Sequence, residues 1–125
     1  IKELTGGMGA NVVYDPVGDS YSEPCIRATA WDGRYLVIGF AAGEIPKIPI
    51  NLALLKGMKI VGVFWGAWVG MNPVENKKNF EELFKLHSEG KINPEVSDSF
   101  SLDDGAKAIA HLKDRKAKGK VIITM

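Results

Sequence analysis

The sequence has very little cysteine and histidine, and this excludes several kinds of site. Its 125 residues contain one cysteine, Cys25, and two histidines, His87 and His111. One cysteine cannot form an internal disulfide, so we expect a reducing compartment, the cytoplasm. A structural zinc site takes four Cys or His ligands, and three such side chains far apart in sequence do not supply them. We therefore predict no metal site.

Long apolar runs and an excess of charge of one sign are also missing. No apolar stretch reaches the length that spans a bilayer, so no membrane partner is expected. Sixteen basic and fifteen acidic residues give a net charge of +1. This balance does not favour binding to nucleic acid. With 46% hydrophobic and 25% charged residues, the composition is that of an ordinary globular domain.

What the chain does contain is two apolar runs, 11–18 and 33–40, that are separated by the length of one helix and have glycine at or near their ends. Such runs are typical of strands buried on both faces, as in a parallel sheet covered by helices. Ligands of open α/β sheets bind beyond the carboxyl ends of the strands, where a glycine lets another molecule approach the backbone. The two runs therefore predict one half of a nucleotide-binding fold.

The rest of the chain continues the alternation of strand and helix. The predicted fold class is α/β, a partial Rossmann-like, mostly parallel sheet flanked by helices. Gly90–Pro94 marks the expected boundary between a partial nucleotide-binding domain, 1–90, and a carboxyl-terminal segment, 91–125. We expect an extended arm at 44–50, strands at 11–15, 34–39, 59–65, 96–100 and 120–124, and helices at about 20–30, 51–57, 74–89 and 102–113.

The first residues, Ile1–Gly7, have the pattern of a last helical turn stopped by glycine, and no methionine precedes them. We therefore expect the sequence to be a fragment. The glycines of Thr5–Ala10 follow this helix end and precede a strand. A phosphate-binding loop has the opposite order, because it follows a strand and opens a helix. We interpret these glycines as a helix-terminating turn.

Several motifs, taken in order, resemble the carboxyl-terminal half of the medium-chain dehydrogenase/reductases. The similarity is greatest to the zinc-independent quinone oxidoreductase branch, which is zeta-crystallin-like, and it covers nearly the whole chain. The motifs that carry the resemblance are Asp15–Gly18, Trp31–Arg34 leading into Leu36–Phe40, Asn51–Lys56, Ile60–Gly66 and Gly119–Ile123.

This resemblance implies an oxidoreductase that passes hydride from NADPH to a quinone or to an activated alkene or carbonyl, with NADH not excluded. It also implies a homodimer formed through strand 59–65. In the family, the phosphate loop and the catalytic lobe precede the segment seen here, and residues 91–125 return to that lobe. The chain alone is therefore expected to be inactive.

The resemblance also implies which residues lie beside the cofactor. It places no catalytic acid or base and no metal ligand in this chain. Each residue also has a structural interpretation: Phe40 and Phe64 as core or interface, Asp15 as part of a turn, and Arg115 as part of a solvated basic loop. The implied cofactor-binding residues are Asp15, Val17, Gly18, Gly39, Phe40, Ala41, Val63, Phe64, Trp65 and Arg115.

Two other functions remain open at the level of sequence. The chain can be a non-catalytic folded fragment that oligomerises through its sheet edges. It can also be half of another Rossmann-like enzyme, such as a methyltransferase, although the strand at 57–65 and the Gly119–Ile123 motif speak against this. The upstream sequence would separate the enzyme from the non-catalytic fragment.

Overall fold

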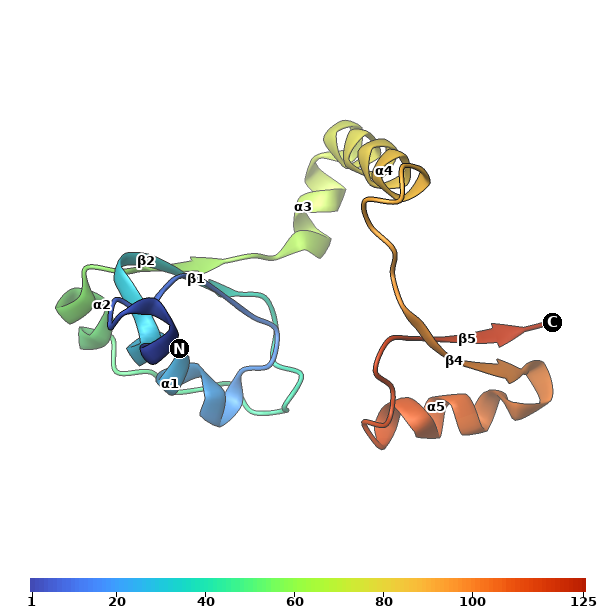
Figure 1. Cartoon of the computed structure of the whole chain (residues 1–125), viewed down its shortest axis with the longest axis horizontal. Helices are drawn as coiled ribbons and strands as arrows, with labels where there is room; N and C mark the ends of the chain where they lie inside the picture. Colours follow the sequence, from blue (N-terminus) through green and yellow to red (C-terminus); the bar gives the residue numbers. More distant parts are fainter. The chain divides into compact units, whose positions relative to one another are not determined.

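A computed structural model describes all residues, 1–125 (Figure 1). The chain divides into two compact units, Ile1–Met71 and Asn72–Met125. The first unit ends before the domain boundary that the sequence predicts after residue 90, and that boundary stays a prediction.

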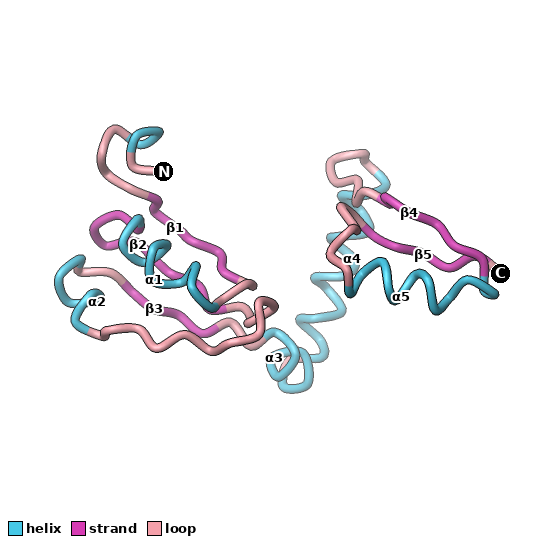
Figure 2. Tube along the Cα trace, turned by 90° about the horizontal axis from the view of Figure 1, so that it is seen from below, coloured by secondary structure: helices cyan, strands magenta, loops and turns pink.

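The first unit contains a three-stranded parallel sheet in the order β1-β2-β3, as Figures 1 and 2 show. The predicted mostly parallel sheet flanked by helices is confirmed. The strands are β1 (Ala10–Asp15), β2 (Thr29–Val37) and β3 (Lys59–Gly62), and the helices are α1 (Ser22–Ala28), α2 (Asn51–Lys56) and α3 (Trp65–Met71), with short 3-10 helices η1 (Glu3–Thr5) and η2 (Asp19–Tyr21).

The core of the first unit lies on one face of its sheet. Ile26 of α1 and Leu52 of α2 pack with Tyr35 of β2 and with Met58, and all four side chains are buried. Val13 lies opposite Tyr35 in the register and packs against the same cluster. Both helices therefore cover the same face of the sheet.

The other face of this sheet is exposed within the chain, which corrects the expectation of strands buried on both faces. Val12 and Tyr14 alternate with the inward residues of β1, and they are 50% and 66% exposed. All of β3 is exposed as well. The helices α1 and α2 pack on one side only, mainly against β1 and β2, which leaves the other face of these strands uncovered and β3 exposed on both faces.

Two predicted boundaries in the first unit are wrong. β2 begins at Thr29 rather than at 34, because the register jumps from Ala10 opposite Thr29 to Val12 opposite Arg34 and so leaves extra residues in β2. The expected strand 59–65 ends at Gly62, and helix α3 begins at Trp65. An apolar run of this length fits a strand or a helix equally well by its periodicity.

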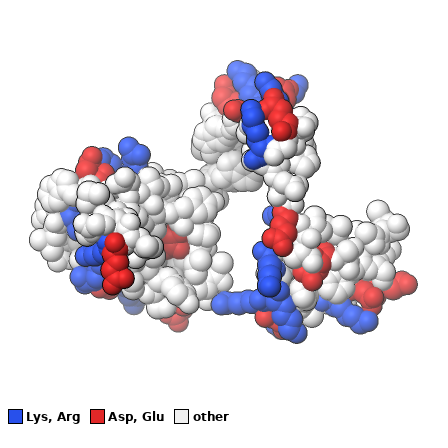
Figure 3. All heavy atoms as spheres, in the orientation of Figure 1, with Lys and Arg blue, Asp and Glu red and all other residues white.

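The second unit begins with α4 (Pro73–Ser88) and continues as a strand-helix-strand unit. Its elements are β4 (Val96–Ser101), the 3-10 helix η3 (Leu102–Asp104), α5 (Gly105–Lys113) and β5 (Lys120–Thr124). β4 and β5 are parallel neighbours. Figure 3 shows charges of both signs side by side over α4, where Lys77 pairs with Glu81 and Lys85 pairs with Glu89.

No helix in the structure combines the length and the apolar character needed to cross a membrane.

Candidate functional site

Two loops meet at the carboxyl ends of β1 and β2. The amide of Ile38 donates to the carbonyl of Asp15 at 3.0 Å, the amide of Ala41 to Pro16 at 3.0 Å, and the amide of Ala42 to Val17 at 3.0 Å. These bonds continue the pairing of the two strands past their ends. They hold residues 15–18 and 38–42 together as one surface at the edge of the sheet.

Gly18 and Phe40 are in direct contact across these loops. Gly18 has a φ of 74°, and a Cβ added there would lie 2.7 Å from Cδ1 of Phe40. The position therefore requires glycine both for its backbone conformation and for the space that the ring takes. Phe40 remains 38% exposed, so the residue is partly accessible to a ligand.

The carboxylate of Asp15 is the centre of a buried hydrogen-bond network beneath the first loop. Asp15 is 6% exposed. Its Oδ1 accepts from the amides of Val17 at 2.8 Å and Gly18 at 2.9 Å. Its Oδ2 accepts from Oγ of Ser22 at 3.0 Å and from the hydroxyl of Tyr35. All four donors come from the loop, α1 and β2.

This network sets the charge states of its members. Burial acts to raise the pKa of Asp15, but the hydrogen bonds from Tyr35, Gly18, Val17 and Ser22 outweigh it and hold the pKa below the usual value. Burial and the bond to Asp15 raise the pKa of Tyr35 to about 12. Burial, with the nearby Asp15 charge, raises the pKa of the Cys25 thiol. Near neutral pH, Asp15 is thus an anion and Tyr35 a neutral donor.

The third part of the predicted site follows β3. The amide of Val63 donates to the carbonyl of Val37 at 2.9 Å, so Val63 stays beside β2 after the strand has ended. Phe64 and Trp65 come next and are 80% and 58% exposed. The structure thus places three groups of predicted residues at the same ends of three adjacent parallel strands: Asp15, Val17 and Gly18; Gly39, Phe40 and Ala41; and Val63, Phe64 and Trp65.

Arg115 is the predicted residue that belongs to the second unit. It lies in the second unit, in the turn after α5, with a φ of 56°. Its amide donates to the carbonyl of Leu112 at 3.0 Å. Its part in a cofactor site stays a prediction.

Sequence reasoning missed two members of the Asp15 network, Ser22 and Tyr35. They lie 7 and 20 residues from Asp15. Ser22 belongs to no motif, and Tyr35 is one residue of the apolar run 33–40 with nothing to mark it as a partner of Asp15. A serine at a helix start and a tyrosine in a strand are both common, so the sequence carried no local signal. Only the pairing of β1 with β2 brings the tyrosine beneath the loop.

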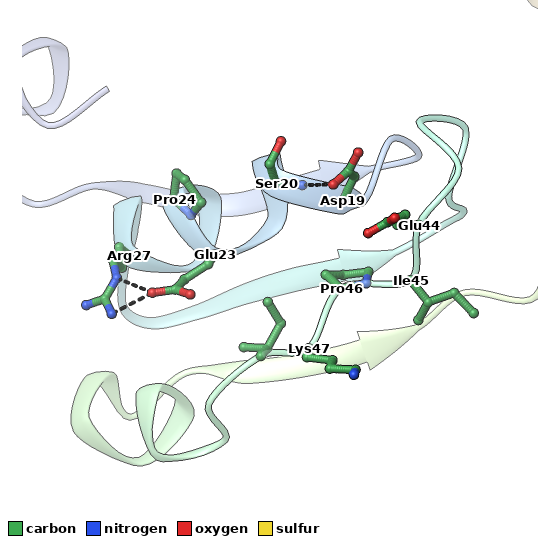
Figure 4. A pocket seen from close by; sticks show the side chains of 10 residues that line it. Asp19, Ser20, Glu23, Pro24, Arg27, Glu44, Ile45, Pro46 and Lys47 are labelled. Atoms are coloured by element: carbon green, nitrogen blue, oxygen red, sulfur yellow. Dashed lines mark hydrogen bonds and ion pairs between the residues drawn. The ribbon is translucent and has the colours of Figure 1, made fainter.

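Two pockets lie on the helix-covered side of the first unit. The larger, of about 600 Å³, lies between α1 and the arm at residues 44–48, and none of the predicted site residues lines it. Figure 4 shows Glu23 and Arg27 paired at one end of it, with Asp19 and Glu44 at the other. The smaller pocket, of about 170 Å³, is apolar and includes Phe40.

Residues 2–123 match the family of zinc-binding dehydrogenases. The chain belongs to this family.

Several individual relatives are quinone oxidoreductases or quinone oxidoreductase-like proteins. The chain is 39% identical over 124 residues to a quinone oxidoreductase-like protein 2 homolog of Nematostella vectensis, covering 98% of this chain and 34% of that protein. A solved quinone oxidoreductase of Pseudomonas syringae superposes with a TM-score of 0.85 at 25% identity, over 100% of this chain and 38% of that one. A mycobacterial structure complexed with NADPH has the same fold, with a TM-score of 0.82 at 24% identity over 99% of this chain and 38% of that one.

The chain thus spans about a third of the length of the relatives that it matches. The description of the matched family, zinc-binding dehydrogenases, names a zinc ion. In this chain no three His, Cys, Asp or Glu side chains are grouped so that they could hold a metal ion. The residues of this chain therefore do not fit a zinc site.

Proposed function

We propose that this chain forms the nicotinamide side of an NADPH-dependent oxidoreductase that reduces a quinone or an activated alkene or carbonyl. One observation carries the proposal. The residues that follow three adjacent parallel strands form a single edge with exposed apolar and aromatic side chains, among them Phe40, Phe64 and Trp65. Dinucleotides bind at this edge in open α/β sheets.

The residues of this edge suit a flat, uncharged ring. Phe40, Phe64 and Trp65 would provide apolar walls that exclude water from the reacting atoms. Val17 is 37% exposed beside them and adds to the wall. The bound cofactor would supply the hydride, and this chain would orient its ring against the substrate.

The comparisons support this proposal in two ways. Several relatives that match nearly the whole chain are named quinone oxidoreductases or quinone oxidoreductase-like proteins. A structure of the same fold was solved with NADPH. The phosphate-binding loop and the catalytic lobe would come from the part of a full-length protein that lies outside these 125 residues.

The proposal predicts weak binding of NADPH by the chain alone. The loop that binds the phosphates supplies much of the affinity for a dinucleotide. Calorimetric titration is expected to give a dissociation constant in the millimolar range or weaker for the chain, and about micromolar for a full-length protein that contains it. Micromolar binding to the chain alone would contradict this division of the site.

We also propose that the full-length protein is a homodimer formed through β3. β3 is an edge strand of the sheet, and its four residues are exposed. Val61 is an apolar residue near its centre. An unprotected edge strand pairs readily with another strand, and a two-fold axis brings the same strand of a second copy to it.

This assembly predicts that Val61→Lys weakens dimerisation, because the charge would be forced into a dry interface. Leu55→Lys is the matched control, since Leu55 is exposed on α2. The measurement is sedimentation equilibrium of the full-length protein at a concentration of roughly tens of micromolar. We expect a dimer for the wild type and for the control, and a monomer for Val61→Lys. A monomeric wild type would refute the assembly.

A further inference from the structure

We propose that Ser22 and Tyr35 are positioning residues for the cofactor edge: their hydroxyls orient the Asp15 carboxylate, and this carboxylate holds the loop at residues 16–18. The inference rests on the proposed function, because it gives this loop a part in holding the nicotinamide. It also assigns Asp15 a role through the loop rather than a contact with the cofactor.

The two oxygens of Asp15 have different partners. Oδ1 accepts only from the loop, through the amides of Val17 at 2.8 Å and Gly18 at 2.9 Å. Oδ2 accepts from two hydroxyls on rigid elements, Ser22 at the start of α1 and Tyr35 in β2. The hydroxyls thus fix the rotation of the carboxylate, and that rotation fixes where the loop amides lie.

The burial of the network leaves very little of its surface accessible to a ligand. Ser22 is 0% exposed, Tyr35 is 4% and Asp15 is 6%. A cofactor that took a bond from Asp15 would leave a buried hydroxyl or amide without a partner, which is unfavourable. The network is therefore placed to act on the loop from beneath.

The loop in turn positions the second loop and the ring of Phe40. The carbonyls of Pro16 and Val17 accept from the amides of Ala41 and Ala42, and Gly18 lies against Phe40. A shift of the first loop would therefore move the second loop and the ring together. Positioning groups act in this way, because they are held by packing and hydrogen bonds behind the site.

The titratable groups that face Asp15 are Tyr35 from β2 and Cys25 from α1. Both carry raised pKa values and are neutral near pH 7. Asp15 is then the one charged member of the network, and its pKa is lowered by its four donors against the effect of burial. Removal of the Tyr35 hydroxyl is expected to raise the pKa of Asp15.

The test uses Tyr35→Phe and Ser22→Ala in a full-length protein that contains this chain. Tyr14→Phe is the matched control, because Tyr14 lies on the opposite face of β1 and is 66% exposed. The first measurement is the hydrogen-exchange protection of the Val17 and Gly18 amides. We expect it to fall about tenfold in both variants, as for the loss of one hydrogen bond to a charged group.

The second measurement is the dissociation constant of NADPH. This constant is expected to rise about three- to tenfold in both variants, because the loop at residues 16–18 is held less firmly. The change in kcat at saturating cofactor is expected to be smaller. Lowering the pH protonates Asp15 and removes the protection of the two amides. In Tyr35→Phe this loss is expected at a higher pH than in the wild type, because the pKa of Asp15 is higher in the variant. Tyr14→Phe should behave as the wild type.

The outcomes separate this inference from the proposed function. Unchanged protection in both variants would overturn the inference, and so would lost protection with unchanged NADPH binding, which would leave the hydroxyls a purely structural role. Lost protection together with weaker binding supports it. If the wild type binds no NADPH, the proposed function fails, and the exchange of the two amides still decides whether Ser22 and Tyr35 hold the loop.

Discussion

Replacing Phe40 by alanine in a full-length protein is expected to lower the turnover number by roughly tenfold or more, as misplacement of reacting groups typically does. The ring lies against Gly18 and is 38% exposed at the strand ends. Its loss would admit water beside the nicotinamide and loosen the geometry of hydride transfer. Trp65→Ala is expected to act in the same direction, since Trp65 is exposed at the end of the neighbouring strand.

Steady-state kinetics with NADPH and a quinone checks this prediction. Phe84→Ala is the control, because Phe84 is an exposed phenylalanine of α4 that belongs to none of the strand-end loops. It should leave the turnover number close to that of the wild type. Unchanged turnover in both Phe40→Ala and Trp65→Ala would show that these residues only pack.

The second large effect is expected for Gly119→Ala, in the second unit. A Cβ at Gly119 would lie 2.4 Å from the carbonyl oxygen and 3.0 Å from the carbonyl carbon of Glu95. These are backbone atoms, so no side chain can move aside. The same carbonyl accepts from the amide of Lys120 at 2.7 Å, and the amide of Gly119 donates to Oγ of Ser97 at 3.0 Å. The new methyl group would push the start of β5 away from β4.

We expect this change to lower the free energy of unfolding by about 3 kcal/mol, the upper part of the usual range for overpacking. Urea unfolding followed by circular dichroism measures it. Gly105→Ala is the matched control, because its Cβ would meet only Cδ1 of Ile123 at the ordinary distance of 3.7 Å. Equal midpoints for Gly119→Ala and the wild type would show that the two strands can separate at no cost.

Elements with a strong periodic pattern were predicted well. The strand expected at 120–124 is β5, with the same bounds, and the helix expected at about 74–89 is α4, Pro73–Ser88. The helix has Phe80, Leu83, Phe84 and His87 at helical spacing, and Gly90 follows it with a φ of 70°. Local sequence determines such elements, since periodicity and a helix-ending glycine act within a few residues.

Features that depend on distant partners could not be predicted. The early start of β2 at Thr29 depends on how its extra residues are accommodated opposite β1. The helix α3 replaces the end of an apolar run, and periodicity does not separate strand from helix there. The Asp15 network joins residues up to 20 positions apart. Its members became visible only through the register of two strands.

The candidate site was predicted from resemblance to a family rather than from chemistry-bearing side chains. Most of its residues are apolar or glycine, and such residues carry no signature of their own in a sequence. The structure places nine of the ten at the carboxyl ends of three adjacent strands of one sheet: Asp15 is the last residue of β1, and eight residues follow the strands. Arg115 lies in the second unit. Their contact with a cofactor stays a prediction.

The proposed function is tested most directly by the consumption of NADPH in the presence of a quinone. The full-length protein that contains this chain is compared with the chain alone, under the same conditions. We predict that NADPH is oxidised in proportion to the amount of full-length protein, and that the chain alone gives no rate above the protein-free reaction. Failure of the full-length protein to oxidise NADPH with any quinone, activated alkene or carbonyl would contradict the proposal.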